Sequence, residues 1–158
     1  MKAPQAILAA LAAAVMLTTG AAAGPDAARE RVAITTQAAQ PSRVSPFVLT
    51  PLQAGRLKRD SGKLTASVPP ERIVMRDGQR VSIYEGTSTL NGKLGSLVIR
   101  YRDEYVEAGN GYHAGTGTWK VVRGTGQYAQ VTGGGRNGNV WLDRGPWSSR
   151  EEGVLTRR

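Results

Sequence analysis

Turn-forming dipeptides and single glycines or prolines interrupt the chain at intervals of about 8 to 12 residues from Val44 onward. The segments between them are rich in β-branched and aromatic residues. None of these segments keeps an apolar period of about 3.6 residues for long enough to form a major helix. Short segments with turn signals at this spacing are typical of an all-β sandwich or barrel. The sequence therefore predicts an all-β domain over residues 44–158.

Eight segments are expected to form one antiparallel sheet. Asp77-Gly78 and Asn91-Gly92 favour type I′ hairpin turns, because Asn, Asp and Gly tolerate the positive φ angles that such turns require. Strands with so short a connection run antiparallel. About eight strands can close into a barrel around core side chains or one small ligand, which also removes exposed edges. The expected strands are Val44–Thr50, Lys63–Val68, Arg72–Arg76, Arg80–Leu90, Leu94–Val106, Tyr112–Arg123, Arg136–Leu142 and Glu152–Thr156.

Two pairing registers are compatible with a hairpin at Asn91-Gly92. A two-residue turn pairs Tyr84 with Ile99 and Ser82 with Tyr101. One bulged residue instead places Val81, Ile83 and Glu85 on the face of Leu97, and this register is favoured because it joins more apolar residues. In either register one face is apolar at one end and polar at the other, as in a strand that runs from a barrel's packed middle to its mouth. That face carries Leu97, Ile99, Tyr101, Asp103 and Tyr105.

The first 43 residues are expected to lie outside the barrel. Residues 1–23 combine Lys2, an apolar run and the small residues Ala21-Ala22-Ala23, which is the pattern of a cleaved secretory signal peptide. The apolar run of 12 residues is shorter than the roughly 20 that a membrane-spanning helix needs. Residues 24–43 show no sustained period and are predicted to form a flexible leader. We therefore expect a secreted or periplasmic protein without a transmembrane segment.

The composition excludes several kinds of site. The chain has no cysteine, so it has neither disulfides nor thiolate sites, and its single histidine, His113, rules out a His-based metal cluster. We expect no metal and no cofactor. His113 follows a turn and is predicted to be an exposed loop residue.

Residues 109–138 contain ten glycines. Gly124-Thr125-Gly126 lacks the Lys-Ser/Thr pair of a P-loop and the third glycine of a dinucleotide fingerprint, and no helical pattern follows it. Nucleotide binding is therefore disfavoured. The glycines are expected to supply positive φ angles and close backbone approach in tight connections between strands.

The same region resembles the segment before the last strands of allene oxide cyclase and dirigent-like barrels of the calycin type. An aromatic-ended strand with two valines is followed by Gly-Thr-Gly, one residue, an aromatic residue, four residues and a glycine. The matching residues are Val121, Val122, Gly124, Thr125, Gly126, Tyr128 and Gly133. Residues 85–87 and 92–96 also resemble a strand-turn-strand of related small secreted bacterial proteins, so the resemblance spans residues 62–138.

This resemblance implies an eight-stranded antiparallel barrel with a central cavity open at one end. Members of these families bind apolar or phenolic small molecules, and the enzymes among them steer a cyclisation or a radical coupling without a cofactor. The matching residues are structural glycines, and no catalytic position of either enzyme family matches this chain. Catalysis therefore stays an open question, and so does a homo-oligomer, which is common among such barrels.

The candidate site residues are those that the alternation turns toward the barrel interior. Asp103 shares its parity with Tyr101 and Tyr105, so an internal position would desolvate its carboxyl group and raise its pKa. Glu85 joins this interior in the bulged register. The alternative for such acids is a surface ion pair, and for the tryptophans it is core packing. The cavity candidates are Tyr84, Glu85, Tyr101, Asp103, Tyr105 and Trp119, and the structural motif comprises Gly124, Thr125, Gly126, Tyr128 and Gly133.

Two functional hypotheses remain. In the first, an exported barrel binds an apolar or phenolic small molecule, with or without cofactor-free cyclase- or isomerase-like activity. In the second, the formal charge of +9, or +8 after loss of Lys2, attracts anionic envelope polymers or nucleic acid without any catalysis. The densest basic segments are 56–59 and 157–158. Nucleic acid is disfavoured because the aromatic residues are not interleaved with the cations, as single-strand binding requires.

Overall fold

The structure, a computed structural model, describes residues 28–39, 42–67, 69–143 and 145–157. These residues form nine strands and one short 3-10 helix, so the all-β prediction is confirmed. The elements are β1 Arg29–Ala38, β2 Val44–Pro51, β3 Asp60–Ala66, β4 Arg72–Arg76, β5 Gln79–Gly92, β6 Ser96–Gly109, β7 Tyr112–Gly124, η1 Gly126–Tyr128, β8 Val131–Leu142 and β9 Trp147–Arg157. No helical segment in the described residues has the length and hydropathy to cross a membrane. The predicted signal peptide, residues 1–23, lies outside the described residues.

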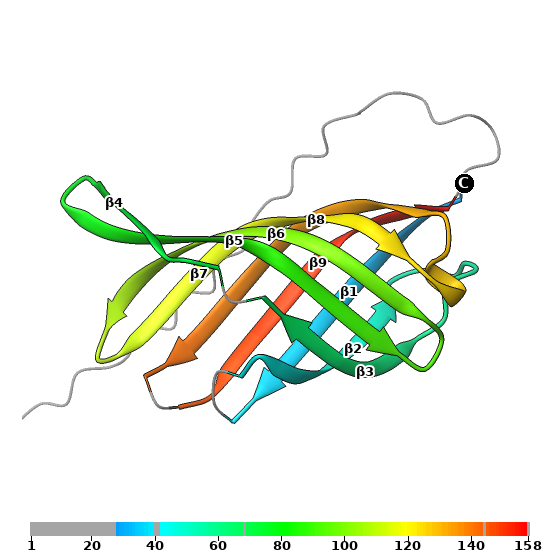
Figure 1. Ribbon diagram of the computed structural model, residues 1–158, viewed down its shortest axis with the longest axis horizontal. Helices are drawn as coiled ribbons and strands as arrows, with labels where there is room; N and C mark the ends of the chain where they lie inside the picture. The colour runs from blue at the N-terminus through cyan, green and yellow to red at the C-terminus, as the bar shows by residue number, and fades with distance from the viewer. Residues whose placement is uncertain (1–27, 40–41, 68, 144, 158) are drawn as a thin grey trace, which may run out of the picture.

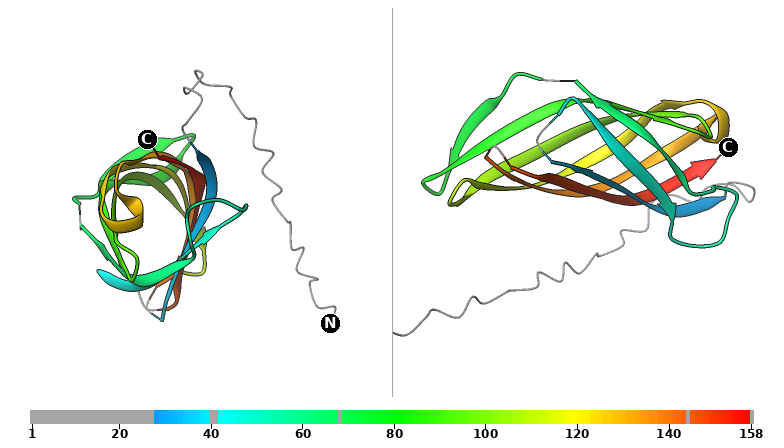
Figure 2. Two further views of the ribbon diagram at one scale, coloured as in Figure 1. Left: turned by 90° about the vertical axis from the view of Figure 1, so that its right-hand side faces the viewer. Right: turned by 90° about the horizontal axis from the view of Figure 1, so that it is seen from below.

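The strands form one antiparallel sheet that closes into a ring. Their order is β3-β2-β1-β9-β8-β7-β6-β5-β4, and an additional pairing of β3 with β5 joins the two sides (Figure 2, left). β5 changes partner along its length, because its residues 88–92 pair with β3 and its residues 79–83 pair with β4. The β4–β5 hairpin therefore projects beyond the ring at one end of the molecule (Figure 1). Eight strands make up the ring, and β4 is an addition to its rim.

The first strand of the ring lies in the segment that the sequence predicted to be a flexible leader. Residues 29–38 form β1, which pairs with β2 on one side and with β9 on the other. Val32 and Ile34 are completely buried, and Arg29 and Arg31, which precede them, are exposed. The inward face of β1 also carries Glu30 and Thr36, so the apolar alternation is short and escapes a search for sustained periodicity. The domain boundary predicted at residue 44 is therefore wrong, because the folded unit already includes residue 29.

The hairpin between β5 and β6 adopts neither of the two predicted registers. Asn91 pairs with Ser96 and Tyr84 pairs with Asp103, so four residues rather than two connect the strands. A long-range contact holds this loop, because the Asp60 carboxylate accepts hydrogen bonds from the backbone N–H groups of Lys93 and Leu94. The favoured bulged register is wrong. Glu85, whose candidacy depended on it, lies on the outer face of the ring.

The other predicted hairpin has the expected tight turn. Arg76 pairs with Gln79, and the two residues between them, Asp77 and Gly78, have φ angles of 50° and 77°. Positive φ at both central positions is the requirement of a type I′ turn. This turn is set by local chemistry alone, in contrast to the loop after Asn91.

An apolar cluster fills the end of the ring that carries η1. Tyr128 of η1 is completely buried there, and its hydroxyl donates to Asp60 Oδ2 at 3.0 Å. The Gly-Thr-Gly motif leads into η1, with Gly126 at a φ angle of 57°. Gly133, further along the chain, has a φ angle of 140°. The cluster comprises Val32, Ile34, Phe47, Leu49, Leu57, Leu64, Leu90, Leu97, Ile99, Trp119, Tyr128, Val131 and Leu155. With this end packed, the space inside the ring lies toward the opposite end.

Candidate functional site

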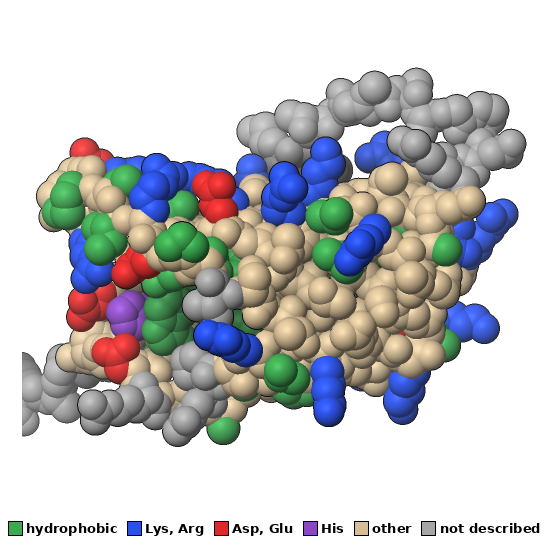
Figure 3. All heavy atoms as spheres, in the orientation of Figure 1, with side chains coloured by type: hydrophobic (Ala, Val, Ile, Leu, Met, Phe, Trp, Pro, Cys, Tyr) green, Lys and Arg blue, Asp and Glu red, His purple; other side chains and the backbone are tan. Residues whose placement is uncertain are grey.

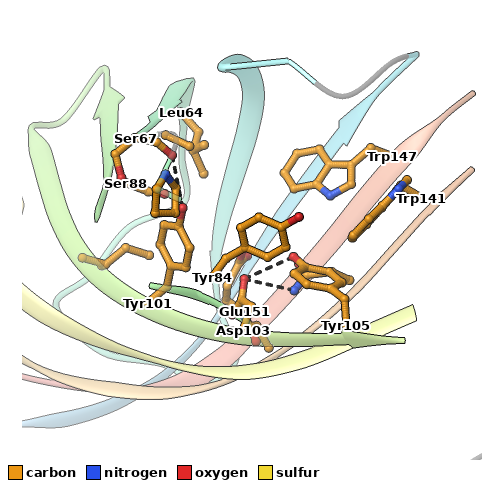
Figure 4. A pocket seen from close by; sticks show the side chains of 15 residues that line it. Leu64, Ser67, Tyr84, Ser88, Tyr101, Asp103, Tyr105, Trp141, Trp147 and Glu151 are labelled. Atoms are coloured by element: carbon orange, nitrogen blue, oxygen red, sulfur yellow. Dashed lines mark hydrogen bonds between the residues drawn. The ribbon is translucent and has the colours of Figure 1, made fainter. Parts of the chain in front are cut away.

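A cavity of about 390 Å³ lies inside the ring, in the half away from η1 (Figure 4). Strands β3, β5, β6, β8 and β9 and the segment after β3 supply its walls. Its lining residues are Leu64, Ala66, Ser67, Pro69, Tyr84, Ser88, Ile99, Tyr101, Asp103, Tyr105, Asn137, Asn139, Trp141, Trp147 and Glu151. Four of the six predicted cavity candidates are among them, namely Tyr84, Tyr101, Asp103 and Tyr105.

Glycines on the inner face give the large cavity side chains their room. Gly115 and Gly117 of β7 pair across the sheet with Tyr105 and Asp103 of β6. A Cβ atom on either glycine would overlap the side chain opposite it. Gly86 stands in the same relation to Tyr101. The sequence interpretation placed the glycines of this region in tight connections, whereas Gly115 and Gly117 lie within a long strand and make space in its interior.

Asp103 is the centre of a buried polar network. Its carboxyl group accepts hydrogen bonds from Asn137 Nδ2 at 2.8 Å, from the Tyr105 hydroxyl at 3.2 Å and from Asn139 Nδ2 at 3.4 Å. Asp103 is only 6% exposed. Burial raises its pKa, and the hydrogen bonds from Asn137 and Tyr105 partly oppose that rise. The structure thus places Asp103 on the inner face with its pKa raised, and its role in binding a ligand stays a prediction.

Glu151 is a second buried carboxyl group in the cavity, and the sequence analysis missed it. It is 6% exposed, and its Oε1 accepts a hydrogen bond from the Ser149 hydroxyl at 3.0 Å. Burial, with a smaller contribution from nearby Asp103, raises its pKa to about 7. The predicted last strand began at Glu152, five residues after the start of β9, and so excluded Glu151. Extending the alternation backward from the core residue Leu155 would have placed Glu151 inside.

Two other buried acids have a structural role instead. The Asp60 carboxylate accepts hydrogen bonds from the backbone N–H groups of Ser61, Lys93 and Leu94 and from the Tyr128 hydroxyl. Glu30 accepts from the backbone N–H groups of Arg56 and Leu57. Backbone donors thus satisfy these carboxylates and tie loops to the ring. The hydrogen bonds to Asp103 come from side chains, Glu151 Oε2 has no partner among the described residues, and both acids line the cavity.

Aromatic rings in edge-to-face contact surround the outer part of the cavity. The Tyr105 ring lies between Tyr84 and Trp141, with ring centroids 5.6 Å and 4.4 Å away. Trp147 of β9 pairs with Trp141 of β8 and turns into the same space (Figure 4). The sequence interpretation favoured core or barrel-end packing for these tryptophans, and they line the cavity as well. The walls therefore offer flat apolar surface around a polar interior.

His113 belongs to the rim of the site. Its ring stacks on Trp141 with centroids 4.6 Å apart, and its Nε2 lies 3.0 Å from Asp143 Oδ1. The predicted exposed loop position is wrong, because His113 lies within β7 on the inner face and is half-buried. No set of three or more His, Asp and Glu residues within the described part of the chain could hold a metal ion.

Two predicted candidates lie outside the cavity. Trp119 is buried in the apolar cluster, where its ring N–H donates to the Arg136 carbonyl oxygen at 3.3 Å. Glu85 is exposed on the outer face and belongs to a chain of ion pairs there. This chain runs through Arg72, Glu85, Arg102, Glu104 and Arg76. Glu85 therefore forms surface ion pairs, which is the alternative that the sequence analysis gave for the acidic candidates.

The charge of the cavity lining is opposite to that of the chain. The chain carries 21 Lys and Arg against 12 Asp and Glu, whereas the described lining residues include two acids and no Lys, Arg or His.

In comparisons with known proteins, no protein-family model, no curated protein and no solved structure matches the chain. The chemistry of this lining therefore carries the functional argument.

Proposed function

We propose that this protein is an exported β-barrel that binds one small molecule with an apolar or aromatic body in its cavity. The observation that carries the proposal is the combination of packed aromatic walls with two buried carboxyl groups, Asp103 and Glu151, on the inner face of one cavity, where Glu151 Oε2 has no hydrogen-bond partner among the described residues. Buried polar groups nearly always have such a partner, so an unpartnered carboxylate oxygen inside a cavity favours a bound molecule. The pattern of the first 23 residues supports export.

The dimensions and lining of the cavity support this function. Small-molecule sites in proteins measure about 300 to 1,000 Å³ and are mostly apolar, with a few polar groups that fix the orientation of the ligand. The cavity, at about 390 Å³, suits a small ligand, and Tyr84, Tyr105, Trp141 and Trp147 supply flat apolar walls. Asp103 and Glu151 are the groups that would orient it.

Proton transfer on the bound molecule is the reaction that the site would support. A carboxyl group with a pKa near the working pH can both accept and donate a proton, and the pKa of Glu151 is raised to about 7. Such a group needs no cofactor for an isomerisation or a cyclisation. The resemblance to allene oxide cyclase and dirigent-like barrels leads to the same expectation.

Replacing Tyr84 by Ala tests the binding function. The probe is naphthol, a small aromatic alcohol. Tyr84 lines the cavity and is partly exposed, so we expect the Tyr84→Ala variant to fold and its affinity for naphthol to fall by about tenfold or more. Tryptophan fluorescence reports binding, because Trp141 and Trp147 line the cavity. Tyr112→Ala, at an exposed tyrosine, is the matched control and should bind naphthol like the native protein. If the native protein binds neither naphthol nor any other small aromatic probe, the proposal is wrong.

The alternative, binding of anionic polymers through the basic surface, gains no comparable site. Cations are spread over the visible face (Figure 3) rather than gathered in one patch. Several of them are already paired with carboxylates, among them Arg72, Arg76, Arg80, Arg102 and Arg150. Steep loss of retention on a polyanion column with added salt would support this alternative.

A further inference from the structure

The interior contains buried polar atoms that have no hydrogen-bond partner among the described residues, and all of them can accept a hydrogen bond. They are Thr36 Oγ1, Asn137 Oδ1 and Glu151 Oε2, all of them buried. The amide oxygen of Asn137 can only accept a hydrogen bond, and so can an ionised Glu151, while the Thr36 hydroxyl can accept as well as donate. An unsatisfied buried acceptor is costly, so a bound molecule that supplies donors would be stabilised here.

These acceptors lie on neighbouring strands of one wall. Asn137 of β8 pairs directly with Glu151 of β9, and Thr36 of β1 pairs with Ser149 of β9. Ser149 and Glu151 are two residues apart and share the inner face. Asp103 belongs to the same group, because Asn137 donates to it across the interior. One ligand group with several donors could therefore meet these oxygens together.

The charge of the cavity lining favours some hydrogen-bond donors of a ligand over others. Asp103 and Glu151 are both acidic, and the described lining residues include no Lys, Arg or His that would neutralise them. A ligand carboxylate or phosphate would be repelled by this lining, whereas a protonated amine would pair with it and offer up to three N–H donors. A neutral hydroxyl group would supply one donor and leave the negative charge uncompensated.

The surroundings of the acids also favour a cation. The faces of Tyr and Trp rings attract an ammonium group, and Tyr84, Tyr105, Trp141 and Trp147 lie along the path into the cavity. Glu71 and Glu107 line a second hollow beside Tyr84 and Tyr105, together with Arg80, which pairs with Glu71, and Asp143 lies against His113. Acidic side chains are visible at this end of the molecule (Figure 3) although the chain as a whole is basic.

We propose that the ligand of this cavity is a small arylalkyl amine, with its ammonium group held by Glu151, Asp103 and the amide oxygen of Asn137 and its ring against the tyrosines and tryptophans. This inference rests on the proposed binding function and names the ligand class. In this binding mode the ammonium end of the ligand lies deep inside the ring and the aromatic end lies toward the open end.

Three matched probes test the inference. Phenethylamine, phenethyl alcohol and hydrocinnamate share an aromatic ring and a short chain, and they carry an ammonium, a hydroxyl and a carboxylate group. We expect calorimetry at about pH 8 to show phenethylamine binding at least about tenfold more tightly than phenethyl alcohol, with no binding of hydrocinnamate. Equal binding of the amine and the alcohol would overturn the inference and leave the proposed binding function standing.

Substitutions then locate the amine. Glu151→Gln and Asp103→Asn should each reduce the preference for the amine over the alcohol by about tenfold, while the alcohol binds as before. Glu152→Gln is the matched control, because Glu152 is the next residue and pairs with Arg150 outside the cavity. If both cavity variants fold and keep the full preference, the inference is wrong. If naphthol and all three probes fail to bind the native protein, both the inference and the proposed function are wrong.

Discussion

At the scale of single residues, hydrogen-bond partners separate structural acids from candidate functional acids. Asp60 and Glu151 are both buried, but Asp60 lies where loop N–H groups converge and Glu151 lies inside a strand. Most N–H groups of a strand are engaged in the sheet, so few backbone donors are available to a side chain in the interior. Glu151 Oε2 has no partner among the described residues, so a ligand could supply its donor.

Glu151 should make the stability of the protein depend on pH. Its pKa is raised from 4.5 to about 7, so between these values the folded chain holds a proton that the unfolded chain has released. The free energy of unfolding should therefore fall as the pH rises from about 4.5 to about 7, by roughly 3 kcal/mol, and stay level above. Asp103, whose pKa is also raised, acts in the same direction.

Urea denaturation at several pH values measures this dependence. Glu151→Gln cannot ionise, so the loss of stability with rising pH should become shallower in this variant. Glu152→Gln, at an exposed neighbour, should keep the slope of the native protein. A Glu151→Gln variant whose stability changes with pH as in the native protein would contradict the raised pKa of Glu151.

At the scale of elements, β7 is built to leave space on one side. Its inward positions His113, Gly115, Gly117 and Trp119 alternate with exposed or half-buried outward residues, and the two glycines stand opposite Tyr105 and Asp103. The strand gives up side chains of its own so that its neighbour can project larger ones. The position of the cavity thus depends on glycines within a strand as much as on the residues that line it.

Adding one methyl group tests this role of β7. In Gly117→Ala the new Cβ would overlap Asp103, the Arg102 carbonyl oxygen and Asn137, so we expect a loss of about 1 to 3 kcal/mol in the free energy of unfolding. Gly138→Ala is the matched control, because a Cβ there meets no atom within 4 Å. The control should be neutral or slightly stabilising. Equal melting temperatures of the two variants would refute the space-making role of Gly117.

At the scale of the whole molecule, ring closure depends on two pairings between distant parts of the chain. β1 joins β2 to β9, at the other end of the chain, and β3 joins β5 through residues 62–66 and 88–92. The ring brings inward-facing residues of β1, β6, β8 and β9 to one interior. Asp103, Asn137 and Glu151 meet only in the closed ring.

Truncation on either side of β1 tests the contribution of this strand. A chain that begins at Ala28 keeps β1 and should unfold cooperatively, at the melting temperature of a chain that begins at Gly24. A chain that begins at Val44 lacks Val32 and Ile34 and leaves edges of β2 and β9 unpaired, so it should lose cooperative unfolding or aggregate. Circular dichroism during heating distinguishes these outcomes. A Val44 chain with native-like unfolding would restore the leader interpretation.

Part of the candidate site follows from local rules, and part does not. The alternation of β6 is sufficient to place Tyr101, Asp103 and Tyr105 on one face, because side-chain direction has a period of two along a strand. The same rule misplaced Glu85, since its face depends on the length of the loop after Asn91. That length is set by Asp60, more than 30 residues away in the sequence.

The sequence by itself determined the all-β class, the tight turn at Asp77-Gly78 and the residues that share a face of each strand. These features depend on backbone geometry and on neighbours within a few residues. Only the tertiary structure decided that residues 29–38 form a strand, which face lies inside and which buried carboxylate oxygen remains without a hydrogen-bond partner among the described residues. The physical reason is that these outcomes depend on pairing between segments far apart in the chain, and no short stretch of residues specifies its distant partner.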